Sequence, residues 1–310
     1  MQEIFCCVCQ EPLTKNAKKI GDRFFCDHHY NKVFVNRKGI WISVLIGIVS
    51  IFAFAGLIVL LDYLVDYQFS GINLVIFGVL ISAGPAFIWV WIFYKLDTLE
   101  PEPKGFILGV FLLGAIFANG IGIPLINGLF NVNEWLYNAE LPLKIISSIL
   151  IIGFIQEYLK YAGVRFTVFI SSEFDERVDG IIYGAVIGLG YATMLNIHYI
   201  ISMGGVNPSV GVMRITISCL AHASFSGISG YFLGRAKFEK MPVWWMPSGV
   251  ALAAVLNGVT HILLKSVSRF GISFTPEFGL IIAGVLASTA FGILFLAIRR
   301  INTGVLQDSE

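Results

Sequence analysis

Long apolar stretches recur along the chain, separated by short polar or turn-rich segments. A membrane-spanning helix needs about 20 predominantly apolar residues. Eight stretches meet this requirement: 40–61, 70–94, 105–126, 143–167, 178–201, 209–234, 243–264 and 278–298. They are too long for the strands of a membrane barrel, so the pattern predicts an all-α, polytopic bundle of about eight spans.

The composition supports this class. Of 310 residues, 56% are hydrophobic and only 13% are charged, whereas soluble domains carry about 25% charged residues. An ordinary soluble domain and a disordered chain are therefore excluded. The net charge of +1 indicates no nucleic-acid partner, and the glycine-rich runs lie within spans, where they would not hold a nucleotide. We expect membrane lipid and a membrane-protein substrate or client as partners.

Lys and Arg are distributed unevenly between the two sides of the predicted bundle. Sixteen lie in the N-terminal segment, in alternate connections and after the last span, and only four lie on the other side. Cytosolic segments carry the excess of basic residues, so both termini are expected in the cytosol and residues 127–141 outside. The first 38 residues are polar and Cys-rich, which is unlike a cleavable signal peptide. Three units follow: a module at 1–38, a membrane domain at 39–301 and a short tail at 302–310.

The N-terminal module carries two short pairs of metal-ligating residues. Cys6 and Cys9 form one pair, and Cys26 and His29 form the second after a spacer of sixteen residues. This spacing is typical of a zinc-ribbon-like site with tetrahedral coordination. Cys7 and His28 adjoin the pairs, so either ligand choice could shift by one residue. The alternative is a loose tail with incidental cysteines.

Several polar residues interrupt the predicted spans. An ionisable group within a membrane is costly and is by default a functional candidate. Glu157 and Lys160 are three residues apart and share a helix face, which also fits a buried ion pair that fixes packing. Glu157 and His222 are expected at a similar depth, where they could hold a metal or transfer a proton. The other polar candidates within spans are Gln156, Asn196, His198, Asn257 and His261.

Small residues in the fifth and sixth predicted spans indicate close helix packing. Gly180, Gly184 and Gly188 follow the small-xxx-small spacing. Ser224, Ser226 and Ser229 are interpreted as packing residues, because no grouping of Ser, His and Asp is evident.

Four stretches resemble the PrsW family of intramembrane metalloproteases, which are related to the CAAX prenyl endopeptidases. The similarity runs from about residue 94 to residue 264. The stretches are the Glu-Pro-Glu-Pro loop at 100–103, Gln-Glu-x-x-Lys at 156–160, the Asp-Gly helix entry at 179–180, and His222 with the following Gly230. The resemblance implies a metal bound inside the bilayer by Glu and His, with an activated water that attacks a peptide bond.

The chain also departs from the family motifs. Gln156 stands where the family has the first Glu of a pair, and Leu195 stands where it has the Glu before Asn196. Asn257-x3-His261 replaces the family's His-x3-Asp. A rearranged metal site could still use Glu157, His222 and His261, although a catalytic zinc usually needs three protein ligands.

Three functions therefore stay open at the level of sequence. One is an intramembrane metalloprotease with an altered site, in which Glu157, His222, Gln156, Asn257 and His261 are the catalytic candidates. A second is a non-catalytic relative, or pseudoprotease, that binds membrane clients and docks through its zinc module. The third is a transporter or channel, but the chain shows no paired interrupted spans of an inverted repeat.

Overall fold

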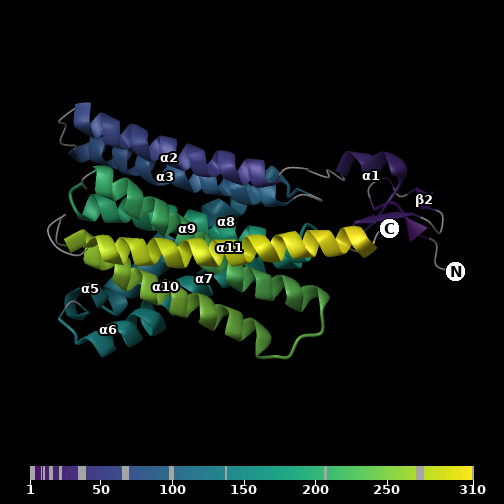
Figure 1. Cartoon of the computed structure of the whole chain (residues 1–310). Helices are drawn as coiled ribbons and strands as arrows, with labels where there is room; N and C mark the ends of the chain where they lie inside the picture. Colours follow the sequence, from purple (N-terminus) through teal and green to yellow (C-terminus); the bar gives the residue numbers. More distant parts are fainter. Residues whose placement is uncertain are drawn as a thin grey trace.

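The computed structural model describes most of the chain. The described residues are 4–7, 9, 11–13, 17–20, 23–33, 40–64, 70–97, 101–136, 138–205, 208–269 and 276–308. Long helices lie side by side in one bundle, and a small module lies beyond one end of it (Figure 1). The prediction of an all-α membrane bundle is confirmed.

The long helices of the bundle coincide with the predicted spans. Single helices form the two N-terminal and four C-terminal crossings: α2 (Ile40–Leu64), α3 (Gly71–Leu96), α8 (Arg177–Ser202), α9 (Pro208–Phe238), α10 (Trp245–Arg269) and α11 (Pro276–Asp308). The other two are composite: α4 (Lys104–Phe117) continues into η1 (Ala118–Gly122) and η2 (Pro124–Leu129), and α6 (Leu141–Ser147) continues through η3 (Ser148–Gly153) into α7 (Phe154–Phe166).

Seven of these helical segments are long and apolar enough to cross a membrane. The exception among the eight predicted spans is α9, which has 31 residues but more polar ones, among them Arg214 and His222. Its position explains the difference. Helix α9 packs against α8, α10, α11, α3 and α2, so it is enclosed by protein and needs few lipid-facing apolar side chains.

Helices α8 and α9 pack backbone to backbone. A Cβ atom at Gly180 would overlap the carbonyl oxygen of Gly230, and one at Gly230 would overlap the carbonyl oxygen of Gly180. Gly184 and Gly188 approach α9 in the same way, against Ser226 and His222. The small-xxx-small interpretation therefore matches the structure, because only glycine allows two helices to approach this closely.

Two segments predicted as regular helix are wound as π-helices. One is η1 with η2 in the C-terminal part of the third span, and the other is η3 in the fourth. Proline interrupts the α-helical hydrogen bonding at Pro124, because it lacks an N–H. At η3, a Cβ on Gly153 would overlap the carbonyl oxygen of Ala254 in α10, so the π-wound turn meets a neighbouring backbone directly. Such turns are frequently found at functional sites.

The two ends of the bundle differ. At one end lie α6 and the short α5 (Val132–Trp135), of which α5 falls within residues 127–141, the segment expected outside the membrane (Figure 1). At the other end lie the short 3-10 helix η4 (Val168–Ile170) and, beyond the bundle, the N-terminal module. Both chain ends lie at this second end (Figure 1), and α11 continues to Asp308, through residues that were predicted to form a tail.

The N-terminal module consists of two hairpins and one short helix. Strands β1 (Ile4–Phe5) and β2 (Pro12–Leu13) pair antiparallel, as do β3 (Lys18–Ile20) and β4 (Arg23–Phe25). Helix α1 (Asp27–Val33) follows β4. Residues 34–39, which join the module to α2, lie outside the described residues, as does the predicted boundary at residue 38.

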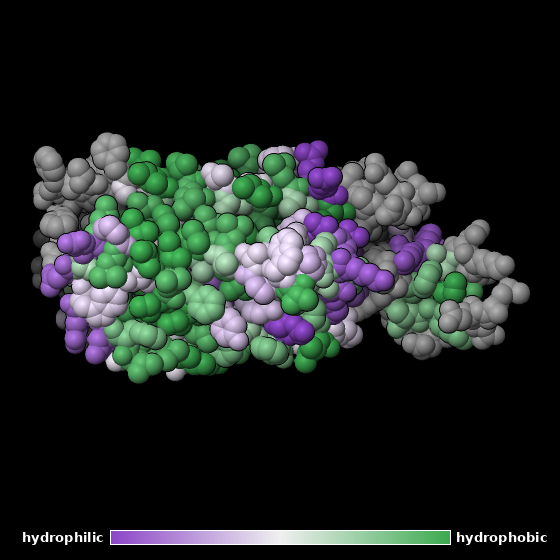
Figure 2. Space-filling model, turned by 90° about the horizontal axis from the view of Figure 1, so that it is seen from below, coloured by the Kyte–Doolittle hydropathy of each residue, from purple (hydrophilic) through white to green (hydrophobic). Residues whose placement is uncertain are grey.

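The surface of the bundle is that of a membrane protein. Hydrophobic residues cover the middle of the visible face as a broad belt, and hydrophilic residues gather toward both ends (Figure 2). Many large apolar side chains of the bundle are exposed, among them Phe52 and Ile72, and a soluble protein would avoid so large an exposed apolar area. The chain is therefore an integral, multi-pass membrane protein.

Candidate functional site

A buried ion pair lies inside the bundle on α7. Lys160 Nζ is 2.5 Å from Glu157 Oε1, and neither side chain has exposed surface. The two residues are three positions apart, so the helix places them on one face. Charged groups can be buried in a low-dielectric interior when they are paired, and these two groups are.

Two neighbouring helices donate further hydrogen bonds to the same carboxylate. Asn257 Nδ2 on α10 is 2.6 Å from Glu157 Oε1 and 3.2 Å from Gln156 Oε1. Ser226 Oγ on α9 is 3.1 Å from Glu157 Oε2. Both carboxylate oxygens thus accept bonds, and Glu157 joins α7, α9 and α10 at one point.

The imidazole of His222 contacts the lysine from the opposite side. Its Nδ1 lies 3.1 Å from Lys160 Nζ. An ammonium group can only donate, so Nδ1 accepts and the imidazole is neutral with its proton on Nε2. Tyr191 of α8 closes this side, because its ring centroid is 6.1 Å from that of His222 and 5.4 Å from Lys160 Nζ. The ammonium therefore lies between Glu157 and His222.

The remaining candidates occupy different positions. His261 lies one turn beyond Asn257 on α10 and close enough to His222 to interact with it electrostatically. Asn196 is buried, but it donates to Cys219 Sγ at 3.6 Å rather than to the cluster. His198 is exposed near the end of α8. The structure thus brings Gln156, Glu157, Lys160, His222 and Asn257 together, with His261 nearby.

Two contributors to this cluster were not recognised in the sequence. Ser226 was interpreted as a packing residue, and Tyr191 appeared only as part of a motif. The signal for Ser226 was its position four residues after His222, on the same face of α9. Tyr191 carried no comparable signal, because an aromatic residue in a buried helix is ordinarily part of the core.

A second buried carboxyl group lies outside the membrane-spanning segments. Glu102 precedes α4, and its Oε2 accepts a hydrogen bond of 2.5 Å from the hydroxyl of Tyr183 on α8. Burial raises the pKa of Glu102 to about 8; the bond from Tyr183 opposes this shift and the neighbouring Asp97 carboxylate contributes to it.

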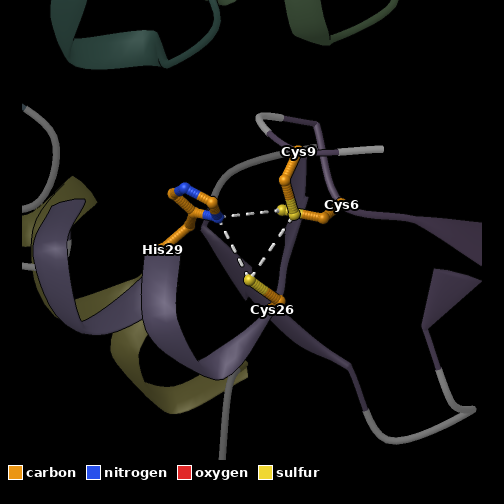
Figure 3. Close-up of side chains that lie close together, drawn as sticks. All are labelled: Cys6, Cys9, Cys26 and His29. Carbon is orange, nitrogen blue, oxygen red and sulfur yellow. Dashed lines mark hydrogen bonds between the residues drawn. The ribbon is translucent and has the colours of Figure 1, made fainter. Parts of the chain in front are cut away.

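The third group of chemically active side chains is in the N-terminal module. Cys6, Cys9, Cys26 and His29 each direct one ligand atom toward a common point, and these atoms all lie within 4.8 Å of one another (Figure 3). The predicted pairs are therefore brought together in a cluster that could hold a metal ion.

The membrane cluster does not fit a metal in the same way. Among the residues that the structure describes, the N-terminal cluster is the one group of three or more His, Cys, Asp or Glu atoms within metal-binding range. At the membrane site, the ammonium of Lys160 stands between the carboxylate and the imidazole. A catalytic zinc needs about three protein ligands, and Asn257 offers an amide that is already bonded to Glu157.

Comparison with known proteins places the bundle in a family. Residues 102–295 match the model of the PrsW family of intramembrane metalloproteases. The chain belongs to the PrsW family. Among similar proteins named Protease PrsW, that of Geobacillus kaustophilus is 32% identical over 197 residues, covering 62% of this chain and 82% of the relative. That of Bacillus subtilis is 32% identical over 195 residues, covering 62% and 85%. No solved structure matches the chain.

The match confirms the family resemblance and separates the two clusters. The PrsW region contains the whole Glu157–Lys160–His222 cluster and also Glu102. The N-terminal cluster and α2 lie before it. The chain is thus a PrsW-family membrane protein, and the N-terminal cluster that could hold a metal ion lies outside the matched region.

Proposed function

We propose that this PrsW-family protein binds membrane-protein segments without cleaving them by the family's metal chemistry. The single observation that carries the proposal is the bonding of Glu157. Lys160 and Asn257 both donate to Oε1 of this carboxylate and Ser226 donates to Oε2, so Oε1 has both acceptor positions filled and the lysine ammonium already neutralises the charge that would otherwise bind a metal or take a proton from water.

The altered motif positions support the same conclusion. In the family pattern a pair of Glu residues precedes the Lys, so one carboxylate can pair with the lysine while the other remains for chemistry. Here Gln156 cannot act as a base or as an anionic ligand, and the only carboxylate of the pair is bound to Lys160. Leu195 stands where the family pattern has another Glu, so a further carboxylate is absent from that position. Catalysis by a metal-activated water requires both an open metal site and a base.

A membrane-protein segment is the client that the family relationship favours. The matched region spans more than four fifths of the relatives named above, which are named proteases. This chain keeps their helical scaffold, so we infer that it keeps the capacity to receive a membrane segment beside α7, where Tyr158 is exposed.

Proteolysis by a rebuilt site is the second candidate. It is favoured by the family name and by His261, which interacts with His222. Together with Glu157 these residues would supply three ligands, provided that Lys160 withdrew from between them.

The orientation belongs to the same proposal. We infer that both termini face the cytosol, because most Lys and Arg residues outside the spans lie on the side of the bundle that holds the two termini. Single cysteines introduced at Asn138 and at Glu239, in a chain stripped of native cysteines, test this with a membrane-impermeant thiol reagent. Labelling of Asn138→Cys alone in intact cells is expected, and labelling of Glu239→Cys alone would overturn the orientation.

The test of function pairs a cleavage readout with a binding readout. Cells expressing the wild-type chain or Glu157→Gln are compared by mass spectrometry for new N-termini in membrane proteins. We expect no difference, and new termini that vanish in Glu157→Gln would establish proteolysis instead.

A photo-crosslinking residue at Tyr158 is expected to capture a defined set of membrane proteins. The matched control is the same residue at Phe52, which is 71% exposed on α2; equal capture at both positions would contradict a client site at α7.

A further inference from the structure

We propose that Cys6, Cys9, Cys26 and His29 bind one zinc ion, and that this ion holds the N-terminal module folded. The proposal is independent of what the membrane cluster does, because the four residues lie outside the PrsW match.

The distances between ligand atoms fit tetrahedral zinc. Cys26 Sγ is 3.1 Å from His29 Nδ1, Cys6 Sγ is 3.8 Å from His29 Nδ1, and Cys9 Sγ is 3.8 Å from Cys26 Sγ (Figure 3). Zinc bonds of about 2.3 Å to sulfur and 2.0–2.1 Å to nitrogen place ligand atoms about 3.5–3.8 Å apart on a tetrahedron. The side chains therefore need only small adjustments to close around one ion.

The donor set selects zinc and a structural role. Three thiolates and one imidazole are soft and borderline ligands, which favour zinc over magnesium or calcium. Four protein ligands fill a tetrahedron, whereas a catalytic zinc keeps one position open. The ion would therefore stabilise the module rather than activate a water molecule.

The local fold explains how four residues from distant positions converge. Cys6 follows β1 and Cys26 follows β4, and His29 lies in the first turn of α1. Backbone hydrogen bonds of 2.9 Å from Cys6 N to Glu11 O and from Cys7 N to Phe24 O join the pieces. The first bond closes the β1–β2 hairpin and the second links it to β4, so both ligand pairs face the same point.

The module has little else to hold it together. Its strands are two or three residues long, and of the module residues whose burial the structure describes, Cys6 and Phe25 alone are buried. A hydrophobic core of this size cannot offset the conformational entropy of about 30 residues. Small domains of this kind are commonly unfolded without their metal.

The structure also separates the ligands from their neighbours. Cys7 and His28 are both exposed, and neither belongs to the converging group. The sequence left two choices open, between Cys6 and Cys7 and between His28 and His29. The structure favours Cys6 and His29 as the ligands. Cys7 and His28 provide matched controls of the same residue types.

The experiment measures metal in the full chain, purified in detergent through a tag that does not bind metal. We expect the wild type, Cys7→Ser and His28→Ala each to hold about one zinc ion per chain more than Cys26→Ser and His29→Ala, whatever the membrane cluster binds. Equal loss in the control and ligand variants, iron in place of zinc, or a folded wild-type chain without metal would each overturn the proposal.

A second readout separates metal loss from general misfolding. Limited proteolysis is expected to remove the module from Cys26→Ser, and from wild type treated with a chelator, while both keep the thermal midpoint of the membrane domain. Resistance of the module in the metal-free state would contradict its dependence on zinc. Addition of cobalt(II) to chelator-treated wild type should restore protection and produce thiolate-to-cobalt absorption, which Cys26→Ser should lack.

Discussion

Lys160 Nζ lies 2.5 Å from Glu157 Oε1 and 3.1 Å from His222 Nδ1, so the lysine bridges the carboxylate of α7 and the imidazole of α9. A fixed ammonium thus occupies the position between a carboxylate and an imidazole. This relationship decides how the membrane cluster responds to mutation.

Removing the lysine charge should destabilise the membrane domain strongly. Lys160→Met leaves the Glu157 carboxylate buried without its cation, and loss of one member of a buried pair costs about 3–5 kcal/mol. Glu157→Gln combined with Lys160→Met should recover part of this loss, because the glutamine oxygen can still accept from Asn257 while its amide nitrogen donates to the Ser226 hydroxyl. Thermal unfolding in detergent of both single variants and the double variant gives the coupling energy; additive effects would show that the pair is not coupled.

Asn257 should contribute to stability rather than to metal binding. Asn257→Ala removes the bonds to Gln156 and Glu157 and leaves buried acceptors, which costs about 1–3 kcal/mol. Val255→Ala on the same helix is the control, since Val255 is exposed on the lipid side of α10. A thermal midpoint that falls equally in both variants would argue against the role assigned to Asn257.

Close packing of α8 and α9 gives a steric prediction. Gly230→Ala would force a Cβ into the carbonyl of Gly180, and overpacking of this kind costs about 1–3 kcal/mol. Gly109→Ala on α4 is the matched control, because a Cβ there meets nothing within 4 Å. The expected result is a lowered thermal midpoint for Gly230→Ala alone, and an unchanged midpoint would contradict the observed helix contact.

Glu102 predicts how stability depends on pH. Because burial raises its pKa to about 8 in the folded chain, the folded state holds this proton more tightly than the unfolded state. The stabilisation is therefore complete below the carboxyl's ordinary pKa and is lost as the pH rises toward 8 and beyond. Glu102→Gln should reduce the fall in thermal midpoint between pH 6 and pH 9; an unchanged fall would assign the pH dependence to other groups.

Much of this arrangement could be predicted from the sequence, for identifiable reasons. Apolar length and few charges specify membrane helices directly, and the Cys6–Cys9 and Cys26–His29 spacing specifies a metal cluster because both pairs are local in sequence. The resemblance also singled out Glu157 and His222, which the structure brings together through Lys160.

The rest depends on contacts between helices, which periodicity does not encode. Nothing local distinguishes Ser226 from a packing serine until α9 is seen to pass Glu157. The π-wound turns before Phe154 lie where Gly153 meets the backbone of α10, and the apolar pattern of the span does not indicate that contact. The length of α9 was enough to predict a span. Its enclosed position among other helices, which accounts for its polar residues, could not be predicted from length.

Metal content of a chain without the N-terminal cluster tests the central claim most directly. Full-length chain carrying Cys9→Ser and Cys26→Ser is purified in detergent after growth with added zinc, and the metal is counted by mass spectrometry. The bonding of Glu157 and Lys160 predicts far less than one metal ion per folded chain. About one ion per chain, lost when His222→Ala is added, would contradict the account and restore a metalloprotease site in the membrane.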